Sequence, residues 1–426
     1  MNEAPEGSRD NSPARESEKP SSPADRPRLT KSFWLVWWAS TISTLGDGIR
    51  YVAFPLVAAT LTKDPQAVSL VFAAGYLPWP LFGLVGGAVA DRVDRRRLMW
   101  TVDSARGVFV AGFAVLVQFA DPHVAALAAL SFALGVAETF FDNAASALVP
   151  MVAEKAVLER ANAWLFSAQT VMSTLVGAPL GAALFAWSPA SPFTADALTF
   201  VTAALLVFAL HGKFTVRTEP PRTTIRRDIA TGLRWLARHR LLRTMCTLVM
   251  VSNAALAAAE AVLVLYTLKV LRMNGFGYGL LLAVLAVFGV LGSALAEQLR
   301  RTTSLRTVLA GSTLVQACAY TSAGITSNLP AAVCAFALVG FGGGVWNVAA
   351  VSLRQASVPP ELLGRVTSSY RTVGLLAMPV GAGLGGTLAT HYGLHAPYLV
   401  GGTILMVTTL LCLPGLRAEE SAASAG

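Results

Sequence analysis

TVLAGSTLVQACAYTSAGITSNLPAAVCAFALVGFGGGVWNVAAVSL, residues 307–353, is the stretch that decides the fold class. Its 47 residues include no Asp, Glu, Lys, Arg or His. A helix on the surface of a soluble protein carries a polar face, whereas a membrane-spanning helix needs about 20 mainly apolar residues in succession. The Ser-Asn-Leu-Pro sequence at residues 327–330 marks a turn within the stretch. The stretch therefore predicts two membrane-spanning helices joined by a short loop.

The composition of the whole chain agrees with this interpretation. Of its 426 residues, 54% are hydrophobic and 13% are charged, and this charged share is about half of that in soluble domains. Apolar runs of sufficient length recur along the chain, and we therefore predict an all-α membrane protein with twelve transmembrane helices. The expected spans lie near residues 33–60, 67–90, 98–120, 124–148, 161–186, 193–211, 241–266, 277–298, 306–326, 330–353, 366–390 and 396–416.

The placement of basic residues orients these spans. With a cytoplasmic N-terminus, 27 of the 33 Lys and Arg residues fall on the cytoplasmic side, and only Lys63, Lys269 and Arg272 fall in outer loops. Cytoplasmic loops of membrane proteins carry an excess of Lys and Arg. We therefore expect a multi-pass protein of the cell (inner) membrane with both termini in the cytoplasm. The net charge of +9 then reflects topology and contact with anionic lipid, and no nucleic-acid partner is expected.

The domain organisation follows from these spans. Residues 225–239 alternate apolar and basic side chains with helical spacing, which predicts a helix on the inner membrane surface between two halves. The predicted units are a disordered cytoplasmic tail (1–31), an N-terminal six-helix bundle (32–211), a cytoplasmic linker with the amphipathic helix (212–240), a C-terminal six-helix bundle (241–416) and a second cytoplasmic tail (417–426).

An internal repeat supports the two halves. GGAVADRV at residues 86–93 aligns with GSALAEQL at 292–299, at an offset of 206 residues. APLGAAL at 178–184 aligns with MPVGAGL at 378–384, at an offset of 200. The members of each pair are six predicted helices apart. Duplication of a six-helix unit, which gives two pseudo-symmetric halves, produces this relationship.

One loop carries a family resemblance. GAVADRVDRRRL at residues 87–98 resembles the loop between helices 2 and 3 of the major facilitator superfamily, Gly-x-Leu-Ala-Asp-Arg-x-Gly-Arg-Arg/Lys-x-Leu. It departs from that pattern at Val89 and Asp94. Residues 32–416 resemble the branch that holds enterobactin-type, macrolide and multidrug exporters. The supporting stretches are LGDG (45–48), Phe141-Asp142 with Pro150, DALTF (196–200), LARHR (236–240) and LGR (363–365).

The resemblance implies a conformational latch at the inner membrane surface. Asp91 is expected to pair with Arg95 and to meet the N-terminus of helix 11, where the helix dipole favours an anion. Asp142 is the expected counter-ion of Arg95, and such a latch would stabilise the outward-facing state. The alternative is that the arginines of this loop only set the topology. The expected latch residues are Gly87, Asp91, Arg92, Arg95 and Asp142.

Charged residues within the spans are the candidate coupling site. Asp47 and Arg50 are three residues apart and share a helix face, as do Glu138 and Asp142 at a spacing of four. A charge near the bilayer centre costs about 2.5–3.5 kcal/mol on insertion scales, so it normally faces a partner or a wet cavity. The alternative is a purely structural Asp47–Arg50 pair. For the similarly spaced Asp103 and Arg106, a packing or latch role is the favoured interpretation.

The resemblance also implies where these charges lie. In the superfamily, helices 1, 4, 7 and 10 line a central cavity, which would bring Asp47, Arg50 and Glu138 together at mid-depth. Glu260 of helix 7 would lie further out. The remaining residues expected to face the substrate are Trp346 and Asn347 of helix 10. Because Arg50 would neutralise Asp47, Glu138 is the expected proton carrier.

Helix 5 carries a further partial match to the superfamily. Gly177, Pro179 and Gly181 follow the Gly-Pro-x-x-Gly-Gly pattern of antiporters in part, with the proline one residue late and Ala182 in place of the last glycine. Small residues allow close helix packing, and a proline bends a helix. We therefore expect helix 5 to approach helix 8 closely.

These observations predict a secondary active transporter that exports amphipathic small molecules or drugs in exchange for protons. Its expected partners are the small-molecule substrate, protons and membrane lipid, and a monomer is expected. The proton motive force would replace any cofactor, and no metal site is expected. Alternatives are a dedicated exporter of a siderophore or antibiotic product and a proton-coupled nutrient importer. An enzyme is not expected, because the chain lacks a Ser/His/Asp set and a Walker loop, Gly-x4-Gly-Lys-Ser/Thr.

Overall fold

The computed structural model describes residues 29–120, 122–212, 214 and 233–417. Throughout these ranges the regular elements are helices. The first half contains α1 (Lys31–Leu61), α2 (Pro65–Tyr76), α3 (Pro78–Ala90), α4 (Arg95–Phe119), α5 (Val124–Val152), η2 (Lys155–Val157), α6 (Leu158–Thr170), η3 (Val171–Gly177), α7 (Ala178–Trp187) and α8 (Ser191–Phe208). The second half contains α10 (Arg240–Leu265), η4 (Tyr266–Val270), α11 (Gly275–Thr302), α12 (Leu305–Ile325), α13 (Leu329–Ser357), α14 (Pro360–Tyr392) and α15 (Ala396–Arg417).

These helices correspond to the predicted spans, and the protein is a multi-pass membrane protein. Ten of the described helices are long and apolar enough to cross a membrane by themselves. The second predicted span is interrupted at Leu77, between α2 and α3. Pro78 follows this residue and has no N–H to donate, so the hydrogen-bond ladder is broken there although Leu77 itself keeps a helical conformation. The fifth and seventh spans include turns of π-helix, at η3 and η4.

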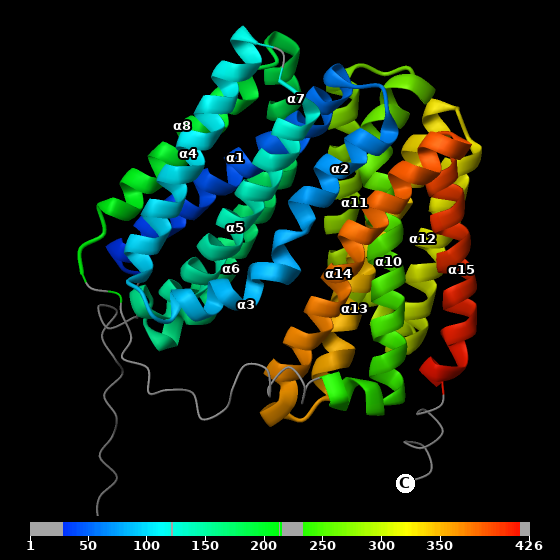
Figure 1. The fold of residues 1–426 in the computed structure, drawn as a ribbon. Coiled ribbons are helices and arrows are strands. Elements are labelled where there is room, and N and C mark those ends of the chain that lie inside the picture. Colours follow the sequence, from blue (N-terminus) through cyan, green and yellow to red (C-terminus); the bar gives the residue numbers. More distant parts are fainter. Residues whose placement is uncertain (1–28, 121, 213, 215–232, 418–426) are drawn as a thin grey trace, which may run out of the picture.

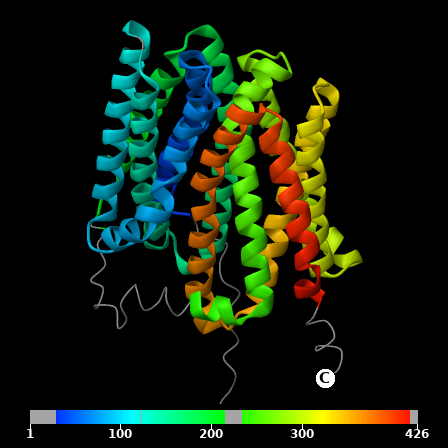
Figure 2. The same ribbon diagram turned by 45° about the vertical axis from the view of Figure 1, so that its right-hand side comes forward.

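The helices form two bundles, α1–α8 and α10–α15, which stand side by side (Figures 1 and 2). They meet where α2 packs on α14 and α7 packs on α11. Side-chain hydrogen bonds join the bundles near the loops at Lys63 and Lys269. The Lys269 ammonium donates to the Lys63 carbonyl at 3.1 Å, and Thr387 donates to the Gln66 side chain at 2.9 Å. This is the expected outer end of the molecule, because the basic residues predict that it faces outward.

The sequence repeat has a counterpart in the packing of the helices. A Cβ atom at Gly181 would lie against the carbonyl oxygen of Ile49 in α1, the first helix of its half. A Cβ atom at Gly381, the aligned residue, would clash with the carbonyl oxygen of Ala254 in α10, the first helix of the other half. The same close contact therefore recurs in both halves, as the pseudo-symmetry of the fold requires.

Most of the predicted tails and linker lies outside the described residues. Within the stretch 225–239, residues 233–238 are helical. Leu236 is buried with residues from the beginning of α10. The remainder of the expected amphipathic helix, and nearly all of the two tails, are not described by the structure.

Candidate transport site

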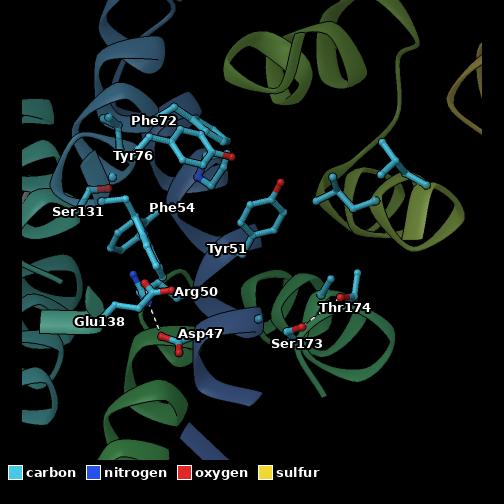
Figure 3. A pocket seen from close by; sticks show the side chains of 18 residues that line it. Asp47, Arg50, Tyr51, Phe54, Phe72, Tyr76, Ser131, Glu138, Ser173 and Thr174 are labelled. Carbon is cyan, nitrogen blue, oxygen red and sulfur yellow. Dashed lines mark hydrogen bonds and ion pairs between the residues drawn. The ribbon is translucent and has the colours of Figure 1, made fainter. Parts of the chain in front are cut away.

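A cavity of about 480 Å³ lies in the first half and is closed on one side by α11 of the second half. Three charged side chains, Asp47, Arg50 and Glu138, lie in one part of it, and Phe72 and Tyr76 lie in another (Figure 3). Further residues that line the cavity include Gly48, Tyr51, Phe54, Trp79, Ser173, Leu282 and Leu285. The cavity therefore combines a charged wall with an aromatic wall, which suits an amphipathic ligand.

Arg50 of α1 is the first of two arginines that organise the charges. Its guanidinium pairs with Asp47 one turn earlier. The same Nη2 atom lies 3.7 Å from the Glu138 carboxylate of α5, and Nε lies 3.4 Å from the Asp196 carboxylate of α8. The guanidinium also lies over the Phe54 ring, 5.5 Å from its centroid. One arginine thus binds carboxylates from three helices.

Arg106 of α4 is the second arginine. Its Nη2 atom lies 3.6 Å from Asp47 and 3.7 Å from Glu138, and Nη1 lies 3.5 Å from Asp103 on the same helix. The side chain is fully buried. Two aromatic rings cover the guanidinium, Phe200 at 4.7 Å and Phe141 at 5.7 Å. These cation–π contacts stabilise a charge that has no access to water.

The glycines around Asp47 explain how α1 reaches its neighbours. A Cβ atom at Gly46 would clash with the Asp196 and Thr199 side chains of α8, and one at Gly48 would clash with the Ser173 backbone of η3. Only glycine permits these approaches, so the sequence Gly-Asp-Gly allows α1 to pack closely against α8 and η3. The Asp47–Arg50 face is thereby held inside the first half.

The cluster contains more acidic than basic side chains. The two arginines lie within 4 Å of four carboxylates, those of Asp47, Asp103, Glu138 and Asp196. Removing one partner of a buried ion pair costs about 3–5 kcal/mol, because the other charge is left without compensation. Such a cluster is stable only when its total charge is matched, and binding a proton or a cation at the carboxylates can match it.

The structure brings Asp47, Arg50 and Glu138 together, but it places Glu260 elsewhere. Glu260 lies in α10 of the second half and accepts a hydrogen bond of 2.8 Å from the Tyr76 hydroxyl of α2. The Tyr51 hydroxyl of α1 approaches the same carboxylate. Both tyrosines line the cavity. Glu260 therefore connects the two halves at the aromatic part of the cavity.

Two residues expected to face the substrate do not line this cavity. Trp346 is buried in the core of the second half with residues of α10 and α12, and Asn347 is exposed elsewhere. The wall that the second half contributes comes from Leu282 and Leu285 of α11 instead. The expectation that Trp346 and Asn347 face the substrate stays a prediction; in this structure the ring of Trp346 packs among apolar neighbours.

Of the expected latch residues, Asp91 and Arg95 lie together. Arg95 pairs with Asp91 at 3.4 Å, and its guanidinium also donates to the carbonyl oxygens of Ala147 and Ala90, at 3.0 and 3.3 Å. The Arg92 side chain is exposed, and a Cβ atom at Gly87 would lie 3.4 Å from Asn143 of α5. The Arg95 guanidinium thus ties the loop before α4 to α5.

Asp142 was expected to pair with Arg95, and the structure does not show that pair. Among the described residues, no ion pair within 4.0 Å joins the two, because backbone carbonyls occupy the Arg95 guanidinium. Asp142 interacts electrostatically with Glu138 and Arg106, and with Arg371 of α14. It therefore extends the buried charge cluster toward the second half.

The departure of Asp94 from the superfamily pattern has a structural role. Its carboxylate caps α4 by accepting a hydrogen bond of 3.0 Å from the Arg97 backbone. The other oxygen accepts from the Phe214 backbone N–H at 3.3 Å. Asp94 thus ties the loop before α4 to the chain that follows α8.

The small residues of the fifth predicted span, which comprises α6, η3 and α7, pack on two different helices. Gly177 and Gly181 lie against Gly48 and Ile49 of α1. The residues that follow the two glycines, Ala178 and Ala182, are the ones that meet Gly279 of α11. The fifth predicted span therefore approaches the eighth, α11, as expected, but through Ala178 and Ala182. Pro179 stands in the first turn of α7, directly after η3, where a missing N–H is tolerated.

Reasoning from the sequence missed three members of the cluster. Asp103 and Arg106 were assigned to packing or a latch, and Asp196 was noted only as part of a family stretch. Each is a charged residue in an apolar span, which is a signal of function in a membrane protein. Helical spacing alone relates residues of one helix, so it could not show that α4 and α8 bring these charges to Arg50.

Comparison with known proteins places the chain in a family. Residues 24–425 match the model of the major facilitator family described as transmembrane secretion effector. The multidrug efflux pump Tap of Mycolicibacterium fortuitum is 27% identical over 399 residues, which cover 90% of this chain and 96% of Tap. Macrolide efflux protein A of Streptococcus pyogenes is 22% identical over 396 residues, covering 89% of this chain and 95% of that protein.

Solved structures share the fold. A bacterial homologue of the lysosomal transporter Spinster, in an inward-facing and unoccupied conformation, superposes with a TM-score of 0.72 at 13% identity and covers 91% of this chain and 96% of its own. A bacterial homologue of the iron transporter ferroportin superposes with a TM-score of 0.69 at 15% identity, covering 91% and 99%. The chain belongs to the transmembrane secretion effector family of the major facilitator superfamily, whose members are transporters.

Proposed function

We propose that this protein exports amphipathic small molecules across the cell (inner) membrane by proton antiport with alternating access. The observation that carries this proposal is the pair of carboxylates, Asp47 and Glu138, that line the cavity beside two buried arginines. Groups that can be neutralised by a proton or by a cationic ligand, but not by both at once, provide the competition on which antiport depends. The efflux relatives support the direction of transport.

The proposal assigns a role to each wall of the cavity. The aromatic side chains, including Phe72, Tyr76 and Trp79, would bind the apolar part of the substrate. Glu138 would carry the proton, because Asp47 is the carboxylate paired directly with Arg50. In this proposal the contacts between the halves at the expected outer end would form the closed side of an alternating-access cycle.

The test uses everted membrane vesicles from cells that express the wild type or Glu138→Gln. Vesicles are energised with a proton gradient, and uptake of erythromycin and of ethidium is measured as two amphipathic probes. Wild-type vesicles should accumulate at least one probe, and a protonophore should abolish the accumulation. Glu138→Gln should reduce gradient-driven uptake by about 10-fold or more while permitting exchange of labelled for unlabelled probe, because the amide resembles a permanently protonated carboxyl.

The control is Glu159→Gln, which removes an exposed carboxylate in the first turn of α6, outside the cavity. Its uptake should equal that of the wild type. Unchanged gradient-driven uptake by Glu138→Gln would contradict the assignment of the proton carrier. Accumulation that is insensitive to the protonophore would contradict antiport itself.

A further inference from the structure

The four carboxylates around the two arginines are of two kinds. The side chains of Asp47 and Glu138 are 22% and 29% exposed and line the cavity. Those of Asp103 and Asp196 are 0% exposed and do not line it. We call the first two the cavity carboxylates and the last two the anchor carboxylates. This division follows access to the cavity, and access decides which groups can exchange protons with water.

Each anchor carboxylate contacts a different arginine. Asp196 lies 3.4 Å from Nε of Arg50, and Asp103 lies 3.5 Å from Nη1 of Arg106. In both arginines a different nitrogen, Nη2, is the one that faces Asp47 and Glu138. A guanidinium is planar, with its donors in a fixed fork. The anchors meet these arginines as ion pairs without hydrogen bonds, and the attraction of one edge to an anchor favours one direction of the other edge.

The charges of anchors and arginines cancel. Two arginines and two anchor carboxylates form a frame that is neutral when all four groups are ionised. The frame leaves the charge of the cavity carboxylates without compensation, and these are the groups that water and substrate can reach. Asp142, the next carboxylate along α5, has the charge of Arg371 as a counterpart in the second half.

We propose that Asp103 and Asp196 are positioning residues that hold Nη2 of both arginines on the cavity carboxylates and thereby set the pH at which this pair exchanges protons. The inference rests on the proton coupling proposed above and adds to it. The arginine partner of each anchor favours its ionised form against the cost of burial, and because neither anchor is exposed to the cavity, neither would exchange protons with the water there.

The surroundings of Glu138 determine the direction of the expected effect. Tyr76 of α2 faces it across the cavity. The charged groups that interact with it come from α1, α4, α8 and its own helix, and they are Asp47, Arg50, Arg106, Asp142 and Asp196. Asp103 is linked to Glu138 through Arg106, which contacts both. Replacing an anchor by asparagine frees its arginine to bind the cavity carboxylates more closely and removes a negative charge nearby. Both changes favour ionised Glu138, so protonation requires a lower pH.

The experiment is an infrared pH titration of the purified protein. The C=O stretching band of a protonated carboxyl that titrates in the wild type and is missing in Glu138→Gln identifies Glu138. Asp196→Asn and Asp103→Asn should each move the midpoint of that band to lower pH, by about one unit. Glu297→Gln, which alters a carboxylate–arginine pair outside the cavity, should leave the midpoint unchanged.

A second variant guards against loss of folding in the single variants. Arg50→Gln combined with Asp196→Asn removes a buried pair as a neutral unit and deprives Glu138 of one arginine. Its midpoint should therefore move to higher pH, opposite to that of Asp196→Asn. A merely structural role of Asp196 would not reverse the sign of the shift.

The outcomes separate the two proposals. A wild type without any titrating band that depends on Glu138 would contradict the proposed proton carrier, and the role of the anchors would fall with it. A normal wild-type band whose midpoint stays the same, or moves to higher pH, in the single anchor variants would overturn only the inference drawn here. Equal shifts of the midpoint in Asp196→Asn and in the double variant would also overturn this inference.

Discussion

At the scale of single residues, the Asp91–Arg95 ion pair joins an exposed carboxylate to a largely buried arginine. The Asp91 side chain is 62% exposed, and Arg95 is held by the backbone of α5 as well as by Asp91. An exposed ion pair contributes about 0–1 kcal/mol to stability. Loss of Asp91 should therefore spare the fold, and any effect on transport would come from another conformation in which this loop meets the second half.

We expect Asp91→Asn to lower the rate of efflux several-fold while the amount of protein in the membrane stays the same. The substitution removes charge but almost no volume, so it weakens the latch without disturbing packing. Initial efflux rates of a fluorescent dye, normalised to immunoblots of the membrane fraction, measure the effect. Glu159→Gln, at an exposed carboxylate in the first turn of α6, serves as the comparison. Normal efflux by both Asp91→Asn and Arg95→Ala would rule out the latch.

The same scale shows what residue patterns could predict. The spacing of Asp47 and Arg50 placed both on one face, and the structure shows them paired. The role of Asp196 depends on Gly46, whose missing side chain lets α8 approach. That contact joins residues 150 positions apart in sequence, and only the packed helices bring them together. Hydropathy could not show whether Trp346 faces the cavity, because it does not fix the rotation of a helix that is apolar on all sides.

At the scale of helices, the apolar runs predicted the spans well. The last span was expected at 396–416, and α15 covers Ala396–Arg417. The irregular backbone was harder to predict. The π-helical turn η3 lies within an uncharged run, and η4 extends the seventh span beyond its predicted end to Val270; the hydrogen-bond pattern of both leaves no mark on hydropathy. η3 matters for the site, since its Ser173 backbone contacts Gly48 beside Asp47.

This contact gives a prediction for the α1–η3 interface. Gly48→Ala should destabilise the protein by about 1–3 kcal/mol, because the added methyl group has no room and forces the helices apart. Thermal unfolding of the purified protein, followed by tryptophan fluorescence, measures the change. Gly112→Ala in α4 is the control, since its Cβ atom would meet nothing within 4 Å. An unfolding temperature of Gly48→Ala equal to that of Gly112→Ala would contradict the argument.

At the scale of the whole molecule, topology is the first property to test. In a cysteine-free background, single cysteines at Lys63, Gly275 and Ser327 should react with a membrane-impermeant maleimide in intact cells. A cysteine at Arg96 should react only after the membrane is opened, and so should one at Thr223, which lies outside the described residues. The excess of basic residues on one side predicts this pattern. The reverse pattern would invert the assigned orientation.

The second whole-molecule property is the closure of the halves at the expected outer end. Tyr76 donates a hydrogen bond of 2.8 Å to Glu260 across the two halves, beside the cavity. A hydrogen bond to a charged group contributes about 1.5–3 kcal/mol, enough to change the ratio of two conformations roughly 10-fold or more. A substrate that displaces the tyrosines would weaken this closure. Occupancy of the cavity and opening of the outer end would then be linked.

Tyr76→Phe and Glu260→Gln should therefore favour opening at this end. The reporter is a cysteine pair at Gln66 and Thr387, whose side chains are hydrogen-bonded across the halves at 2.9 Å, in a cysteine-free background. A short bifunctional thiol reagent should link the pair readily in the parent protein and several-fold more slowly in either variant. Tyr266→Phe is the matched control, because the Tyr266 hydroxyl bonds only to carbonyls of its own half, those of Ala323 and Thr326, among the described residues. Equal linking rates in Tyr76→Phe and Tyr266→Phe would show that the Tyr76–Glu260 bond does not hold the halves together.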